Sequence, residues 1–125
     1  MNWFRLVIDM AIQNIAVLGA GQMGNGITQV AAAAGYNVTM IDIQQEYVEK
    51  GLATIERSLS KLVSKERMTQ EDADATLARI SLSTDRANCA DCDLVVEAVP
   101  EIVDLKTSIF AESRSAGRLQ ITISY

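Results

Sequence analysis

The spacing of apolar and polar residues along the chain predicts strands and helices in alternation. Short apolar runs, typical of buried parallel strands, cover Asn14–Leu18, Asn37–Ile43, Ile80–Ser83 and Asp93–Ala98. Helical spacing is expected over Met23–Ala34, Gln45–Lys65, Thr69–Arg79 and Val103–Glu112. This order predicts an α/β fold of the Rossmann type, a doubly wound parallel sheet in which the second and third helices form an inserted helical hairpin.

The longest predicted helix is amphipathic. Its apolar residues are spaced four and three apart and so share one face, namely Val48, Leu52, Ile55, Leu59 and Leu62. Basic residues lie on roughly the opposite face, namely Lys50, Arg57, Lys61 and Lys65. The spacing leaves two interpretations open, a solvated helix face or a surface that attracts an anion such as a CoA phosphate.

A glycine-rich segment follows the first predicted strand directly and opens the first predicted helix. Gly19, Gly21 and Gly24 form a G-x-G-x-x-G pattern that also includes Gln22 and Met23. The first glycine permits a tight turn, the second lets a pyrophosphate approach the backbone, and the third lets the helix pack closely. The amide groups at the helix N-terminus would then face the phosphates, so the segment predicts a dinucleotide site.

An acidic residue ends the second predicted strand, eighteen residues after Gly24. Asp42 is placed to accept hydrogen bonds from both hydroxyls of an adenosine ribose. Its charge would repel a 2′-phosphate, and the next residues, Ile43, Gln44 and Gln45, include no arginine. We therefore expect NAD rather than NADP. The simpler interpretation of Asp42 is a cap for the following helix.

Composition narrows the possible chemistry. The chain has 125 residues, a net charge of −5 and no histidine, so the composition disfavours nucleic acid as the main partner and supplies no histidine base. Cys89 and Cys92 form a C-x-x-C pair, but two ligands do not complete a zinc site, and we expect ordinary cytosolic thiols and no metal. No apolar run approaches the length of a membrane span, so a cytoplasmic location is expected.

Together these segments resemble the N-terminal NAD-binding domain of L-3-hydroxyacyl-CoA and 3-hydroxybutyryl-CoA dehydrogenases. The resemblance rests on residues 17–27, Asp42, the hairpin of residues 45–79 and the segment 94–101. It implies NAD-dependent oxidation of a 3-hydroxyacyl-CoA to the 3-keto product, a step of fatty-acid β-oxidation or butyrate-type metabolism. It further implies that Glu101 and Lys106 contact NAD and that Ser58 and Lys65 contact CoA.

The resemblance has a limit. The family continues into a turn with a substrate-contacting serine, a catalytic His–Glu pair and a helical domain that forms the dimer, and the present sequence departs from this pattern after Glu112. We expect the chain to be truncated before the catalytic half, by a frameshift or deletion, and to contain no catalytic residue. Residues 11–112 are expected to form the NAD-binding domain, and residues 1–10 a poorly ordered or wrongly assigned extension.

Residues 113–125 form an atypical tail. Within it Leu119–Tyr125 alternates apolar and polar residues, which predicts a strand that pairs beside the fourth strand after a right-handed crossover. Two other functions remain open from the sequence. One is a different NAD-dependent dehydrogenase of the 6-phosphogluconate or UDP-sugar type, and the other is a non-catalytic NAD-binding module.

Overall fold

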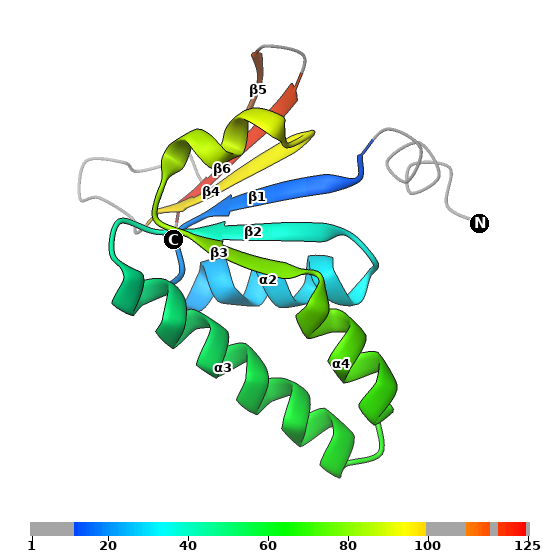
Figure 1. Ribbon diagram of the computed structural model, residues 1–125. Helices are drawn as coiled ribbons and strands as arrows, with labels where there is room; N and C mark the ends of the chain where they lie inside the picture. The colour runs from blue at the N-terminus through cyan, green and yellow to red at the C-terminus, as the bar shows by residue number, and fades with distance from the viewer. Residues whose placement is uncertain (1–11, 100–109, 116–117, 125) are drawn as a thin grey trace.

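The computed structural model describes residues 12–99, 110–115 and 118–124, which build a six-stranded sheet with helices on both faces (Figure 1). The strand order is β3-β2-β1-β4-β6-β5. The strands are β1 (Asn14–Leu18), β2 (Asn37–Ile41), β3 (Ile80–Ser83), β4 (Leu94–Val99), β5 (Phe110–Ser115) and β6 (Arg118–Ser124). Every neighbouring pair is parallel except β5 and β6, which pair antiparallel at one edge.

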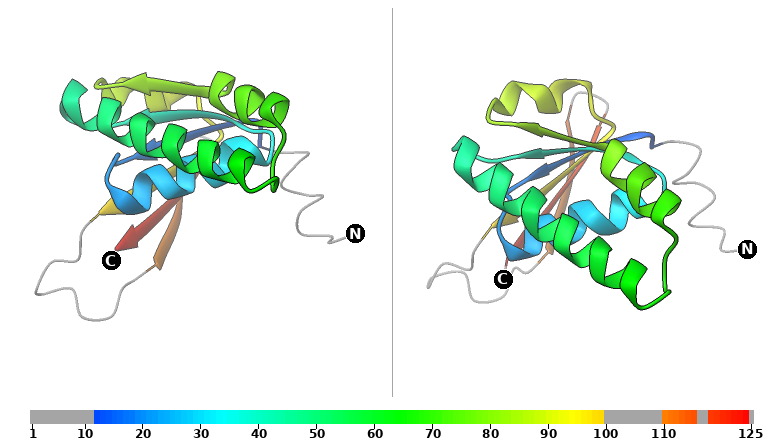
Figure 2. Two further views of the ribbon diagram at one scale, coloured as in Figure 1. Left: turned by 90° about the horizontal axis from the view of Figure 1, so that it is seen from below. Right: turned by 60° about the horizontal axis from the view of Figure 1, so that its bottom comes forward.

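The two faces of the sheet carry different helices (Figures 1 and 2). One face packs against α2 (Gln22–Ala33), α3 (Gln45–Ser64) and α4 (Gln70–Ala78), and the other against the short 3-10 helix η1 (Arg86–Asp91). Right-handed connections explain this division. The connections from β1 to β2 and from β2 to β3 lead toward one edge of the sheet, whereas the connection from β3 to β4 leads back toward the other edge. A right-handed connection that reverses its direction across the sheet must lie on the opposite face.

Local signals account for the helix boundaries. α2 is followed by Gly35, whose φ of +107° suits the left-handed end of a helix. α4 begins after Thr69, whose hydroxyl accepts a hydrogen bond from the Asp72 N–H at 3.1 Å. The apolar face predicted for α3 is confirmed: Val48, Ile55 and Leu59 are fully buried, and Leu52 and Leu62 pack against them.

The predicted order of strands and helices is confirmed for residues 14–98, with small differences in length. The second strand ends at Ile41 instead of Ile43. The pairing of the tail is confirmed as well, because β6 lies parallel to β4 with Leu94 opposite Leu119 and Val96 opposite Ile121.

One predicted helix is wrong at its end. Residues 110–112 of the range Val103–Glu112 belong to β5, and residues 103–109 lie outside the described part of the chain. The route to β6 is also different from the expected helical crossover. The chain enters β6 from β5, which lies in the same sheet and pairs antiparallel with it, so a hairpin replaces that last step.

The two cysteines and the lengths of the helices bear on two further predictions from the sequence. Cys89 and Cys92 are not joined by a disulfide, and both are buried with Ala16, Leu18 and Val95 on the η1 face of the sheet. They therefore serve as small core residues in the structure. Of the helices in the described segments, none combines the length and the apolar character needed to cross a membrane.

The start of β1 is held in place by the carboxylate of Asp93, a residue distant in sequence. Asp93, just before β4, accepts hydrogen bonds from the backbone N–H groups of Gln13 and Asn14, both at 3.0 Å. These two bonds hold the pKa of Asp93 below its ordinary value of 3.8, because they favour the charged form. The same residue donates its own N–H to the Asn14 carbonyl at 2.8 Å, so the two central strands begin in register.

We predict that Asp93→Asn lowers the free energy of unfolding at neutral pH. A lowered carboxyl pKa contributes stability that is present above the unfolded-state value and is lost as pH falls through the folded-state value. The difference in the free energy of unfolding between the native chain and Asp93→Asn should therefore be constant from neutral pH to about pH 5. It should become smaller below about pH 4. Urea denaturation across this pH range measures it, and the matched control is the nearby exposed carboxylate variant Asp91→Asn. If the difference in unfolding free energy did not depend on pH, the charged Asp93 carboxylate would not be the source of the stabilisation.

Candidate cofactor-binding site

The candidate site lies where the connections of the sheet diverge. From the carboxyl end of β1 the chain passes to α2 on one face, whereas the neighbouring strand β4 is reached from η1 on the other face. Such a divergence leaves a crevice at the carboxyl ends of the strands, where open α/β sheets bind their ligands. Here the structure has a cleft of about 400 Å³ lined by residues that include Gly19, Gly21, Asp42 and Ala98.

Two glycines allow the loop after β1 to pack without clashes. Gly19 has a φ of +115°, and a Cβ at this position would lie 2.6 Å from the Ala98 carbonyl oxygen on β4. A Cβ on Gly24 would lie 1.8 Å from the Gly19 carbonyl oxygen. No side chain fits in either place, so the first turn of α2 lies directly against the loop. The glycines predicted from the sequence are therefore required by the backbone itself.

The N-terminus of α2 is suited to an anion. Gly21 is its N-cap residue, and among the described residues no side chain caps this end and no acidic residue lies in the first turn. The amide groups of Gln22, Met23 and Gly24 belong to this turn, where a helix has no carbonyl partners for its N–H groups. With an exposed Gly21 in front of it, the turn can accommodate a pyrophosphate.

Asp42 connects the end of β2 to the glycine-rich loop. Its Oδ2 accepts a hydrogen bond from the Ala20 N–H at 2.8 Å, and its Oδ1 accepts one from the Ile43 N–H at 2.7 Å. A carboxylate has about four acceptor positions, so about two remain for the hydroxyls of a ribose. The interpretation of Asp42 as a helix cap does not hold, since the N-cap of α3 is Gln44.

Several residues of the cleft were not predicted from the sequence. Tyr47 follows the N-terminus of α3, Thr84 and Arg86 come from the segment after β3, and Glu97 comes from β4. Arg86 Nη2 lies 3.4 Å from Glu97 Oε2, with most of the arginine side chain exposed. A guanidinium in this place can stack on an adenine ring or pair with a phosphate. No local motif indicates these residues, because only the strand order brings them together.

The remaining predicted site residues lie elsewhere. Glu101 and Lys106 are outside the described residues. Ser58 is half-buried in the middle of α3, and the exposed Lys65 directly follows the helix end. Since α3 begins next to Asp42 and has 20 residues, Lys65 lies about 30 Å along the helix from the cleft. The structure therefore does not bring these two residues together with the glycine-rich loop.

The other basic residues of α3 are solvent-exposed. Lys50 forms an ion pair with Glu46 one turn earlier at 3.1 Å, and Arg57 donates a hydrogen bond to the Thr54 hydroxyl at 3.2 Å. Both contacts are local to the helix and exposed, so they contribute little stability. The structure therefore supports a solvated face for this part of α3.

The parallel sheet, the glycine-rich turn before α2 and the acidic residue at the end of β2 define a Rossmann-type dinucleotide-binding domain. Residues 14–123 match the family model described as the NAD binding domain of 3-hydroxyacyl-CoA dehydrogenase. The match covers most of the chain, and the chain therefore belongs to this family, whose NAD-binding domain it contains. The match also decides against a dehydrogenase of the 6-phosphogluconate or UDP-sugar type.

Named relatives agree with this assignment. The chain is 46% identical to a probable 3-hydroxybutyryl-CoA dehydrogenase of Deinococcus radiodurans, over 77% of this chain and 34% of the relative. It is 43% identical to a 3-hydroxybutyryl-CoA dehydrogenase of Bradyrhizobium diazoefficiens, over 81% of this chain and 34% of the relative. The crystal structure of (S)-3-hydroxybutyryl-CoA dehydrogenase from Ralstonia eutropha superimposes with a TM-score of 0.71 and 45% identity, covering 78% of this chain and 35% of that one. The chain thus spans about a third of the length of these relatives.

Two glycines of α2 provide a matched test of the close packing in this loop. We predict that Gly24→Ala destabilises the domain by at least about 1–3 kcal/mol, because its Cβ has no room against the Gly19 carbonyl oxygen. A Cβ on Gly26 meets nothing within 4 Å, so Gly26→Ala should be neutral or stabilising by up to about 1 kcal/mol. Thermal denaturation of both variants measures the contrast. Equal stability of the two variants would show that α2 is not held against the loop.

Proposed function

We propose that this domain holds NAD in the cleft at the carboxyl ends of β1, β2 and β4, as the cofactor-binding part of a 3-hydroxyacyl-CoA dehydrogenase. The carrying observation is the contact between α2 and the Gly19 loop, which leaves the amide groups of the first helical turn free for a pyrophosphate. Gly19, Gly21, Gln22, Met23 and Gly24 would cradle the phosphates. In this proposal Asp42 binds the adenine ribose.

The cofactor preference follows from the charges of the cleft. Asp42 and Glu97 place two carboxylates in it, and Arg86 supplies one positive charge that is already close to Glu97. A 2′-phosphate would therefore meet an excess of negative charge next to the ribose position. In NAD the same position carries a hydroxyl, which can donate a hydrogen bond to Asp42. These charges favour NAD over NADP.

We predict that NADH binds saturably to the purified chain and that NADPH binds much more weakly. Asp42→Asn should weaken NADH binding about 10- to 150-fold, since a carboxylate acceptor typically contributes about 1.5–3 kcal/mol to a hydrogen-bonded complex. Calorimetric titration measures both affinities. Asp74→Asn, an exposed carboxylate change on α4, is the control and should leave the affinity unchanged.

The fold must be monitored in the same experiment, because Asp42 also accepts the Ala20 N–H. Circular dichroism and the thermal midpoint of Asp42→Asn separate a lost ligand contact from a disrupted loop. Unchanged NADH affinity in a folded Asp42→Asn chain would contradict the proposed role of Asp42. A folded native chain that binds neither nucleotide would contradict the proposed function of the cleft.

The substrate of the enzyme is proposed from the names of the relatives. The Deinococcus and Bradyrhizobium proteins are named for 3-hydroxybutyryl-CoA, so we propose a 3-hydroxyacyl-CoA as the substrate, in fatty-acid or butyrate-type metabolism and in the cytoplasm. Oxidation of its hydroxyl needs a base near the transferred proton. The 125 residues include no histidine, and we expect them to bind NAD without catalysing hydride transfer. In this proposal, the family's catalytic and dimer-forming elements lie outside these residues.

The hairpin of α3 and α4 is the proposed CoA contact. Ser58 and Lys65 are carried over from the family resemblance, and the exposed position of Lys65 at the hairpin turn allows it to meet a phosphate. We predict that Lys65→Ala weakens binding of acetoacetyl-CoA about two- to fivefold, the effect of one exposed ion pair. NADH affinity should not change, because α3 separates the two places by about 30 Å.

Lys50→Ala is the matched control for this experiment, since Lys50 lies at the opposite end of the same helix and pairs with Glu46. It removes the same charge from α3 while leaving the hairpin turn intact. Equal losses of acetoacetyl-CoA affinity in both variants would show a general effect of charge and would contradict a specific contact at Lys65.

A further inference from the structure

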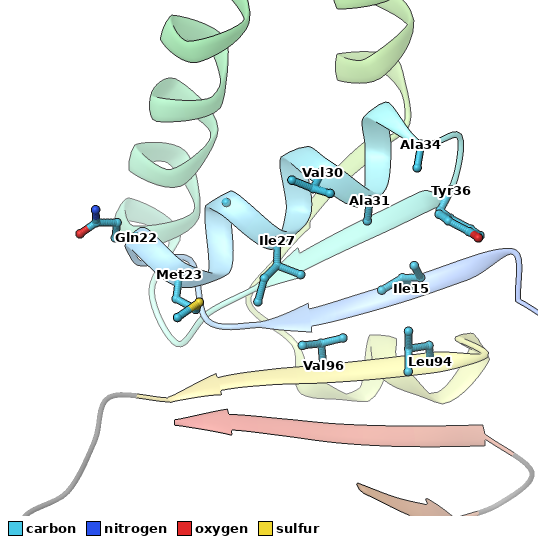
Figure 3. Close-up of a pocket in the computed structure, with 11 residues that line it drawn as sticks. Ile15, Gln22, Met23, Ile27, Val30, Ala31, Ala34, Tyr36, Leu94 and Val96 are labelled. Carbon is cyan, nitrogen blue, oxygen red and sulfur yellow. The ribbon is translucent and has the colours of Figure 1, made fainter. Parts of the chain in front are cut away.

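The helix α2 is supported unequally on its two sides. Toward β4 it borders an apolar hollow of about 870 Å³, whose lining includes Ile27 and Val30 of α2 and Val96 of β4 (Figure 3). Among the described residues nothing fills this hollow, and Val30 is 71% exposed. Toward β2, in contrast, α2 contacts α3 directly. Lateral support for the first turn of α2 and for the loop before it therefore comes from the side of α3.

A glycine interrupts the apolar face of α3 where this helix passes the glycine-rich loop. Gly51 is buried and lies on the same face as Val48 and Ile55, three residues after the one and four before the other. Glycine is unfavourable inside a helix, because its backbone loses more conformational freedom on folding than that of any other residue. A buried glycine in the middle of a helix of 20 residues therefore indicates that a side chain has no room at this position.

The space next to Gly51 is occupied by Ala20 of the glycine-rich loop. A Cβ on Gly51 would lie 2.9 Å from the Ala20 carbonyl oxygen and 3.2 Å from the Ala20 Cβ. It would also lie 3.0 Å from Cε of Met40. The end of the methionine side chain can move away, but a backbone oxygen moves only with its peptide. A side chain at position 51 would therefore displace either α3 or the loop.

Ala20 is held on three sides. Its N–H donates a hydrogen bond to Asp42 Oδ2 at 2.8 Å, and its carbonyl oxygen accepts one from Asn25 Nδ2 at 3.5 Å. On the third side the same oxygen lies against Gly51. A trans peptide directs its C=O and its N–H to opposite sides, so the position of this carbonyl also determines where the Gly21 N–H points. Gly21 and Asp42 both line the cofactor cleft, and both depend on the placement of Ala20.

We propose that Gly51 is a positioning residue for the cofactor. Because it has no side chain, α3 can approach closely enough to hold the Ala20 peptide in the orientation that presents the Asp42 carboxylate and the Gly21 N–H to a nucleotide. Gly51 is not among the described residues that line the cleft, and it acts through Ala20. This inference rests on the proposed function of the cleft.

The substitution Gly51→Ala tests this role by adding one methyl group. NADH affinity, measured by calorimetry well below the thermal midpoint, should fall about tenfold, the effect of losing about one hydrogen bond to a charged group. The preference for NADH over NADPH should also become smaller, because Asp42 sets this preference in the proposed site. Gly26→Ala is the matched control. It adds the same methyl group to α2, where the new Cβ meets nothing within 4 Å, and should leave both affinities unchanged.

A second control separates the positioning role from a loss of stability. Leu62→Ala removes apolar contacts of α3 with the same cluster, about 16 Å along the helix from Gly51. It should lower the thermal midpoint without changing the NADH affinity or the nucleotide preference of the folded chain. If Gly51→Ala alone does not fold, the double variant Ala20→Gly/Gly51→Ala removes the contact with the Ala20 Cβ. Its NADH affinity should be lower than that of Ala20→Gly alone.

The possible results distinguish this inference from the proposed function. Unchanged NADH affinity and unchanged nucleotide preference in a folded Gly51→Ala chain would overturn the inference and leave the proposed function intact. Equal losses of affinity in Gly51→Ala and Leu62→Ala would assign the effect to stability and would also overturn it. A folded native chain that binds neither nucleotide would contradict the proposed function, and the inference with it.

Discussion

The close contact between α2 and the loop after β1 is the constraint on which the site depends. Because neither Gly19 nor Gly24 has a Cβ, the first helical turn can lie against the loop carbonyl, and Gly19 can donate its N–H to the Ile41 carbonyl at 2.7 Å. That bond brings the ends of β1 and β2 together. Asp42, the next residue after β2, then reaches the Ala20 N–H from the side. The absence of a Cβ at Gly19 and Gly24 thus determines the position of the proposed phosphate-binding turn and the position of the Asp42 carboxylate next to it.

The features that the sequence predicted are those with a local cause. Strands β1 to β4, the three helices on one face, the glycine turn and Asp42 all depend on residue spacing or on backbone geometry within a few residues. Arg86 and Glu97 have no such signal. They lie eleven residues apart and meet in the cleft only because β4 is placed next to β1. Sequence patterns do not encode that placement, so this part of the site needed the structure.

The error at residues 110–112 has a similar origin. Helical spacing across 103–112 is a local signal, whereas residues 110–115 pair antiparallel with β6. Pairing of neighbouring strands can override intrinsic preference, because hydrogen bonds and cross-strand contacts decide the state. The pairing of β6 with β4 also keeps this apolar strand, which contains Leu94, Val95 and Val96, away from the edge of the sheet, where its backbone N–H and C=O groups would be unpaired.

The helix α3 sets the relation between the two proposed binding places. It begins at Gln45, three residues after Asp42, and ends at Ser64, directly before Lys65. Its buried face is packed continuously from Val48 to Leu59, so the helix is held as one rigid element against the rest of the domain. The separation of about 30 Å is therefore fixed by helix length and does not depend on a hinge. A cofactor at one end and an acyl-CoA at the other would bind independently unless another part of the enzyme brings their reacting groups together. Under the two proposed sites, the domain would supply two anchoring points, and the place where the two ligands meet would be determined by the extended ligands and by groups beyond α3.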